Sequence, residues 1–149
     1  MFLLAGGAVS WRSKKQTIVA LSTCEAEYVA LCSTTKEALW LTRLLQNLLP
    51  NEFQVPTIIC VDNQGTIDLS RTEAINNRTK HIDVRYHFIR ESIQKNLVAL
   101  KKVSSQDQLA DSLTKPLGPN LFLSSISKLG LATDQSNTHD QGGVLKYSN

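Results

Sequence analysis

The sequence has few of the features that mark secreted or membrane proteins. Its 149 residues include three cysteines, an odd number, with no CxxC pair and no cluster of cysteine with histidine. This disfavours a disulfide framework or a zinc site and favours a reducing compartment, so we expect an intracellular protein, cytoplasmic or nuclear and not secreted. No apolar run is long enough to span a bilayer. The apolar run Met1–Ala5 lacks the basic segment that begins a signal peptide, and Gly6 and Gly7 end the run early. We therefore do not interpret it as a signal peptide.

Charged residues are also not abundant in the chain. Charged residues make up 19% and hydrophobic residues 42% of the chain, an ordinary globular balance that allows one domain with a core. The net charge of +3 is by itself weak evidence for a nucleic-acid partner. We expect one domain over residues 1–131. Residues 132–149 are mostly small and polar, which predicts a disordered tail.

The order of apolar patterns predicts an α/β fold. Ser22–Glu25 has the form of a capping box, in which the serine hydroxyl accepts an amide and Glu25 bonds back to the cap amide. The helix that follows is expected to kink or split around 33–35.

Thr57–Val61 is continuously apolar, as expected for a strand buried on both faces. Strands are predicted at 2–4, 8–12, 57–61 and 97–103, with extended chain at 17–22. Helices are predicted at 22–48, 82–95, 106–115 and 119–129, with a short helix through Ile67 and Leu69. Asn96 and Gly130 are expected to end two of these helices. This order predicts a sandwich of helices on a sheet of mixed strand directions.

Three acidic residues stand in otherwise apolar contexts: Glu27 in the first turns of the long helix, Asp62 directly after an apolar strand, and Asp111 within a half-buried helical segment. Each has a structural alternative. Glu27 suits the positive end of a helix dipole, Asp62 suits a helix cap, and Asp111 suits a solvated helix position.

Taken together, the three carboxylates suggest a metal site. Ligands bind at the carboxyl ends of strands in α/β sheets, where Asp62 is predicted to lie. Clustered carboxylates repel one another unless a cation neutralises them, and hard oxygen ligands select Mg²⁺ or Mn²⁺. Such a site suits two-metal hydrolysis of phosphodiesters.

Seven motifs follow one another along the chain: Ser13–Gln16, Leu21–Tyr28, Val61–Gln64, Arg78–Asp83, Tyr86–Glu91, Ala110–Asp111 and Thr114–Leu117. Their order resembles that of the ribonuclease H domain at the end of copia-type retrotransposon Pol polyproteins. The resemblance runs from about residue 2 to about residue 131.

The resemblance implies an RNase H-like fold, a mixed sheet flanked by helices. It also implies Mg²⁺- or Mn²⁺-dependent cleavage of RNA in RNA–DNA hybrids, alongside the reverse transcriptase portion of the same polyprotein. Glu27, Asp62 and Asp111 match three of the family's four catalytic, metal-binding acids. Glu25 competes with Glu27 for its role, and Glu27 is preferred because Glu25 is already used in the capping box.

The chain departs from the family at its start. The family's first catalytic aspartate lies on its first strand, and residues 1–13 contain no acidic residue. We therefore expect the first strand and much of the second to be missing, and the isolated chain to be poorly stable and to have little or no nuclease activity, since unpaired buried amides cost about 1–3 kcal/mol each.

Residues 71–102 carry eight basic against three acidic residues, a net charge of +5 that exceeds the +3 of the whole chain. Such an excess can follow phosphates, and it is also typical of a solvated helix surface. The predicted substrate contacts are Arg78, Lys80, His81 and Arg85. His81 and His87 lie six residues apart, which disfavours a zinc pair on one helix face.

The sequence is also compatible with two other functions. One is a nucleic-acid-binding remnant without catalysis, and the other is a decayed element fragment with no function. Assays of cleavage and of binding on one hybrid substrate distinguish the nuclease from the binding remnant.

Overall fold

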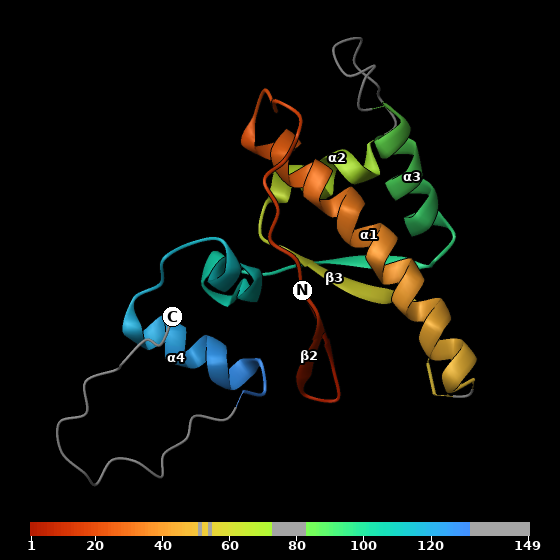
Figure 1. Cartoon of the computed structure of the whole chain (residues 1–149). Coiled ribbons are helices and arrows are strands. Elements are labelled where there is room, and N and C mark those ends of the chain that lie inside the picture. The colour runs from red at the N-terminus through yellow and green to blue at the C-terminus, as the bar shows by residue number, and fades with distance from the viewer. Residues whose placement is uncertain (51, 54, 73–82, 132–149) are drawn as a thin grey trace, which may run out of the picture.

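The chain is a mixed α/β protein. The computed structural model describes residues 1–50, 52–53, 55–72 and 83–131, and Figure 1 shows how their elements are arranged. In chain order these are β1 (Phe2–Leu4), β2 (Gly7–Ser10), α1 (Thr23–Leu48), β3 (Thr57–Val61), α2 (Gln64–Arg71), α3 (Asp83–Gln94), β4 (Val98–Lys102), the 3₁₀ helices η2 (Ser105–Asp107) and η3 (Leu109–Leu113), and α4 (Pro119–Lys128).

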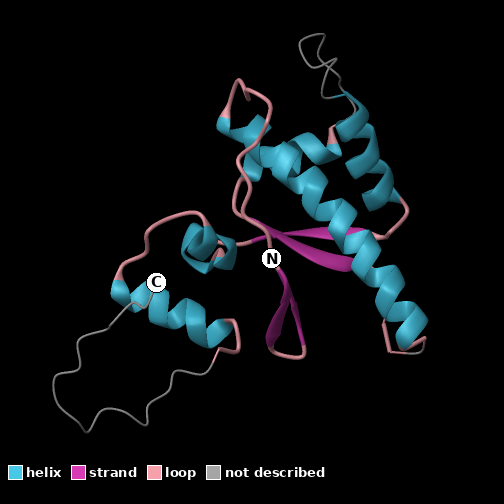
Figure 2. Cartoon of the chain, viewed as in Figure 1, coloured by secondary structure: helices cyan, strands magenta, loops and turns pink. Residues whose placement is uncertain are grey.

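The described strands form two separate two-stranded sheets (Figure 2). β1 and β2 are antiparallel across a turn in which Ala5 and Gly6 both have positive φ, of 49° and 82°, as the tightest hairpins require. β3 and β4 are parallel, with Thr57 opposite Val98. Both strand directions were predicted, but the single mixed sheet was not found in this part of the chain. The predicted extended segment at 17–22 forms no strand.

Helix α1 begins where the sequence predicts. The Ser22 hydroxyl accepts a 3.1 Å hydrogen bond from the Glu25 amide, as expected of the cap. The capping box predicted that the Glu25 carboxylate accepts a hydrogen bond from the Ser22 amide. In the structure it accepts one of 2.7 Å from the amide of the preceding residue, Leu21. The expected split is absent, since the helix is continuous from Thr23 to Leu48, and the hydroxyls at 33–35 bond carbonyls four residues back in the same helix.

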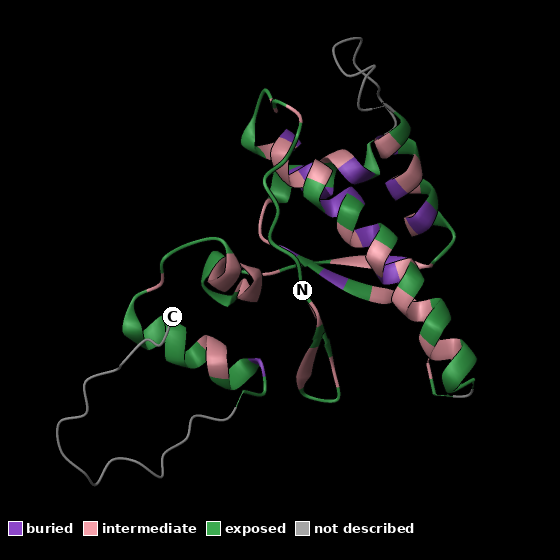
Figure 3. Cartoon of the chain, viewed as in Figure 1, coloured by how far each residue is buried: buried purple, intermediate pink, exposed green. Residues whose placement is uncertain are grey.

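The core lies between one face of the β3–β4 sheet and helices α1, α2 and α3, which Figure 1 shows on the same side of that sheet. Its buried residues gather where these elements meet (Figure 3), and they are Tyr28, Leu31, Cys32, Ala38, Ile59, Val61, Ile67, Tyr86, Ile89 and Val98. The expectation that β3 is buried on both faces is wrong. Ile58 is 56% exposed and Cys60 is exposed, because the described helices cover only the face that carries Ile59 and Val61.

The C-terminal part differs from the prediction in one respect. The expected helix at 106–115 is instead the two 3₁₀ helices, which meet at Gln108. The two predicted helix ends are confirmed: Asn96 follows α3 with a φ of 55°, and Gly130 follows α4 with a φ of 69°. Gly130 also packs against the β1–β2 turn, where a Cβ atom would lie 2.0 Å from the carbonyl oxygen of Gly6. The predicted disordered tail, 132–149, lies outside the described residues.

Among the helices of the described residues, none combines the length and the apolar character needed to cross a membrane. The three cysteines are free thiols.

Candidate functional site

Glu27 lies in the second turn of α1, half-buried and directed toward the end of β3. Burial raises the pKa of Glu27 above its ordinary value, and the negative charge of Asp62 raises it further. A hydrogen bond with the Asn63 side chain and the positive charges of Lys102 and Lys115 act in the opposite direction on this pKa. Glu27 is therefore close to both residues that follow β3.

Asp62 follows the last residue of β3, and its position is fixed from two sides. The Ser105 hydroxyl donates a 3.1 Å hydrogen bond to Asp62 Oδ2, and the Lys102 ammonium donates one to the Asp62 main-chain oxygen. Asn63 caps α2 by accepting the Thr66 amide at 3.2 Å. Strand β3 thus ends in a short polar turn that presents Asp62 at the carboxyl end of the parallel pair.

Asp111 lies in η3, with 21% of its side chain exposed. Its carboxylate forms an ion pair of 2.8 Å with the ammonium of Lys115, four residues later. The hydrogen bond to Asp111 raises the pKa of Lys115, and the charges of Asp111, Asp62 and Glu27 raise it further, against the opposing effect of burial. One ammonium group is therefore within the electrostatic reach of all three carboxylates.

The structure thus brings the three predicted acids to one region, at the end of β3, from α1, the turn after β3, and η3. Within the residues that the structure describes, no three acidic, histidine or cysteine side chains lie close enough to hold one metal ion together. The donor set fits a hard divalent cation in its chemistry, because it consists of carboxylate oxygens gathered around a positive charge. The arrangement itself is not closed around an ion, and the Lys115 ammonium contacts one of the three acids, Asp111.

Glu25 and Glu27 have different surroundings. Glu25 is 9% exposed and its Oε2 accepts the Leu21 amide at the start of the helix. Glu27 is the glutamate whose pKa responds to Asp62. Glu25 thus bonds the start of its own helix and Glu27 lies near Asp62, while the choice of Glu27 for the site stays a prediction.

Of the predicted substrate contacts, Arg78, Lys80 and His81 lie outside the described residues. Arg85 is on α3 and half-buried, and among the described residues its Nη1 atom is buried without a hydrogen-bond partner. Its positive charge lowers the pKa of the Cys32 thiol on α1, although burial raises that pKa overall. Arg85 therefore lies against α1.

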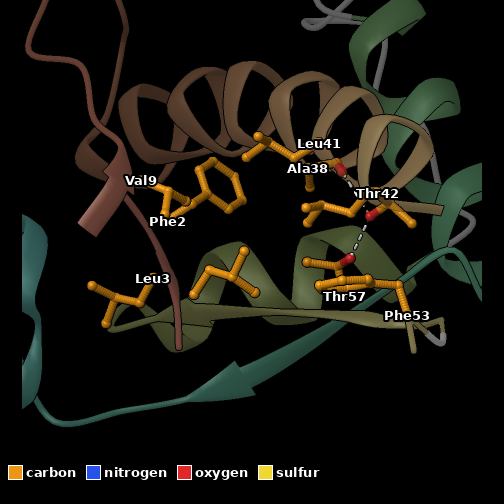
Figure 4. A pocket seen from close by; sticks show the side chains of 10 residues that line it. Phe2, Leu3, Val9, Ala38, Leu41, Thr42, Phe53 and Thr57 are labelled. Carbon is orange, nitrogen blue, oxygen red and sulfur yellow. Dashed lines mark hydrogen bonds between the residues drawn. The ribbon is translucent and has the colours of Figure 1, made fainter. Parts of the chain in front are cut away.

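An apolar cavity of about 170 Å³ lies at the other end of β3 (Figure 4). Its walls come from the β1–β2 hairpin, the second half of α1 and the segment around Phe53, and Thr57 bonds Thr42 across it at 2.7 Å. Because Thr57 begins β3 and Asp62 follows its end, the cavity is separate from the carboxylates.

The sequence interpretation did not assign Lys115, Lys102, Ser105 or Asn63 to the site. Lys115 carried a usable signal, since acidic and basic residues four apart in a helical segment form ion pairs. Lys102 and Ser105 carried none, because their contacts with Asp62 depend on how β4 and η2 pack against β3.

Comparison with known proteins gives the class of the chain. No protein-family profile matches it, and no solved structure matches it. The chain is 47% identical over 122 residues, 82% of its length, to the retrovirus-related Pol polyprotein from transposon TNT 1-94 of Nicotiana tabacum. It is 42% identical over 123 residues to the corresponding polyprotein from transposon RE1 of Arabidopsis thaliana, and 39% identical over 138 residues to that from transposon RE2.

These relatives are much longer than the chain, whose matched part spans 9%, 8% and 9% of their respective lengths. A shorter stretch of 42 residues, 28% of the chain, is 64% identical to the secreted RxLR effector protein 161 of Plasmopara viticola, of which it covers 30%. The chain is therefore a homologue of one segment of retroelement Pol polyproteins. The similarity to the tobacco and Arabidopsis transposon polyproteins extends over most of the chain, whereas that to the RxLR effector protein covers 28% of it.

Proposed function

We propose that the chain is the RNase H segment of a retroelement Pol polyprotein and takes part in hydrolysis of the RNA strand of RNA–DNA hybrids. The observation that carries this proposal is that Glu27 lies near enough to Asp62, at the carboxyl end of β3, for the Asp62 charge to raise its pKa, with Asp111 and its partner Lys115 in the same region. The similarity to Pol polyproteins supports it, because the segment similar to the RE2 polyprotein makes up 93% of the chain and includes Glu27, Asp62 and Asp111.

In this proposal the three carboxylates bind Mg²⁺ or Mn²⁺, which would supply positive charge and Lewis acidity for phosphodiester hydrolysis. The chain's own residues position the acids. Ser105 holds one oxygen of Asp62, and the Asn63 side chain holds Glu27. Lys102 fixes the main chain at Asp62. We expect these contacts to limit the movement that the carboxylates need to make when a cation binds.

The proposed substrate is an RNA–DNA hybrid, and the proposed partner is the reverse transcriptase portion of the same polyprotein. Arg78, Lys80, His81 and Arg85 would contact phosphates, in keeping with the net charge of +5 over residues 71–102. Phosphate contacts of this kind predict affinity that falls steeply as salt rises.

The test compares binding and cleavage on one labelled hybrid by the full chain. We expect Mg²⁺ to increase affinity for the hybrid, because the cation links carboxylates to phosphate. Asp62→Asn should abolish this increase. Asp68→Asn is the matched control, since Asp68 is exposed on α2 and bonds Gln64 instead. Binding that is independent of Mg²⁺ and unchanged by Asp62→Asn would contradict the proposal.

A second function, nucleic-acid binding without catalysis, is favoured by one observation: the described carboxylates are not closed around a metal position. The same experiment separates the two functions. Little or no cleavage is expected of the isolated chain in either case, so the binding data decide: a Mg²⁺-dependent gain in affinity that disappears in Asp62→Asn identifies the nuclease segment, whereas salt-sensitive binding that is independent of Mg²⁺ identifies the binding module.

A further inference from the structure

Strand β3 has one edge without a partner strand. The Thr57 amide donates a 3.1 Å hydrogen bond to the Leu97 carbonyl, so the backbone groups of Thr57 face β4. Those of the alternate residues, Ile58 and Cys60, face the opposite edge. In the described part of the chain β3 pairs with β4 alone, and the Gln108 side chain takes the Cys60 carbonyl at 3.4 Å. The Ile58 amide and carbonyl are thus left available to a further strand.

The apolar cavity of about 170 Å³ lies between the start of β3 and the β1–β2 hairpin, with α1 over it (Figure 4). Its two polar side chains are satisfied, because the Thr42 hydroxyl bonds the Ala38 carbonyl at 2.8 Å and the Thr57 hydroxyl at 2.7 Å. The other lining side chains are apolar. Pockets for drug-sized molecules measure about 300–1,000 Å³. The smaller cavity suits one or two apolar side chains.

The described chain ends beside this cavity. Gly130 packs on the hairpin turn, where a Cβ atom would lie 2.0 Å from the Gly6 carbonyl oxygen, and all three residues of β1 line the cavity. Residues 132–149 are mostly small and polar, but Val144, Leu145 and Tyr147 lie close together near their end. The 12 residues 132–143 precede this apolar segment. A random coil of that length spans roughly 20 Å, enough to reach the cavity from the hairpin turn.

We propose that residues 144–147 bind along the free edge of β3 and place Leu145 and Tyr147 in the apolar cavity. Alternate residues of a strand share one face, so Lys146 would point away from the cavity. Strand addition combines main-chain hydrogen bonds along an edge with pockets for alternate side chains, and both are present here. A tethered segment has a high effective concentration, so four residues can occupy such a site. The inference does not depend on the carboxylates or on the proposed function.

The test is amide hydrogen exchange of the full chain, followed by nuclear magnetic resonance. The Ile58 amide should be protected, because the added strand accepts its hydrogen bond. Leu145→Ser should speed its exchange about tenfold, the factor expected for losing the burial of one leucine side chain. Lys146→Ser is the matched control, one position along the same segment, and should leave the exchange unchanged. The Ile59 amide faces β4 and should be equally protected in all three chains, which verifies that the fold is intact.

A measurement on the unchanged chain locates the segment directly. Nuclear Overhauser contacts should join the Tyr147 ring to the Leu41 methyl groups in the cavity wall, and they should persist on dilution. The inference would be overturned if the Ile58 amide exchanged like an unbonded amide, or if its protection survived Leu145→Ser, which would assign the edge to another occupant. Protection that rises with protein concentration would assign it to a second copy of the chain, with the same consequence.

Discussion

Burial raises the pKa of Glu27 on α1, and the Asp62 carboxylate, at the end of β3, raises it further. The two residues belong to different elements and meet because α1 packs across β3. Two like charges held near each other in a folded protein represent a cost in free energy, and that cost is commonly found where a site binds a positively charged ligand.

The first prediction follows from the raised pKa of Glu27. The folded chain binds this proton more tightly than the unfolded chain does, so the free energy of unfolding falls as pH rises from the ordinary glutamate pKa through the raised one. Glu27→Gln does not titrate. It should therefore be more stable than the unchanged chain at neutral pH, by about a few tenths of a kcal/mol after allowance for solvent screening.

Urea unfolding at neutral and at acidic pH measures this difference. Below the ordinary pKa of glutamate both chains carry a neutral side chain at position 27, so the difference should vanish there. A gain that persists in acid, or a loss of stability at neutral pH, would contradict the electrostatic account of Glu27.

The second prediction concerns the start of α1. Ser22→Ala removes the hydroxyl that accepts the Glu25 amide and should lower the free energy of unfolding by about 1 kcal/mol. Ser33→Ala is the matched control: it is the same substitution in the same helix at an exposed position, where the hydroxyl bonds only its own helix. Thermal unfolding by circular dichroism should show a loss for Ser22→Ala alone, and equal effects of the two changes would argue against the cap.

The third prediction separates the two neighbouring glutamates. Glu25→Ala leaves the Leu21 amide without its 2.7 Å partner in a part-buried position and should cost about 1–3 kcal/mol of stability. Its Mn²⁺ affinity should stay near that of the unchanged chain, whereas Glu27→Gln should weaken Mn²⁺ binding. Both quantities come from one set of calorimetric and unfolding experiments. The assignment would be reversed if Glu25→Ala lost Mn²⁺ binding and Glu27→Gln kept it.

The fourth prediction concerns the contact between the end of α4 and the hairpin turn. Gly130→Ala places a methyl group 2.0 Å from the Gly6 carbonyl oxygen at a φ of 69°, so α4 should detach from the turn or unfolding should become easier by about 1–2 kcal/mol. Gly118→Ala, at the other end of α4, meets no atom within 4 Å and should have little effect. Amide exchange at residues 2–10 measures the contact. Equal protection in the two variants would show that the close approach does not hold the hairpin.

Local signals in the sequence predicted much of this fold. The Ser22 cap, the strand Thr57–Val61, the left-handed Asn96 and the stop at Gly130 each depend on residues near one another in the chain, and the structure has all of them. The hydroxyls at 33–35 do not split the helix as the sequence allowed, because they bond carbonyls within it.

The errors concern relations between distant segments. The apolar run in β3 does not reveal that helices cover only one of its faces, so Ile58 was expected to be buried. The pairing of β1 with β2 alone, and of β3 with β4 alone, depends on tertiary packing. Within the site, Glu27, Asp62 and Asp111 were identifiable as unexpected acids, but the contacts of Lys102 and Ser105 with Asp62 required knowledge of how β4 and η2 pack against β3.

The most direct test of the account is paramagnetic broadening of the chain's amide resonances by Mn²⁺, recorded as the ion is added in small steps. One shared site predicts that the amides of Glu27, Asp62 and Asp111 broaden together at the same Mn²⁺ concentration, with Asp68 unaffected at that point. Broadening of only one of the three, or of none before exposed acids elsewhere respond, would show that these carboxylates do not form a common cation site.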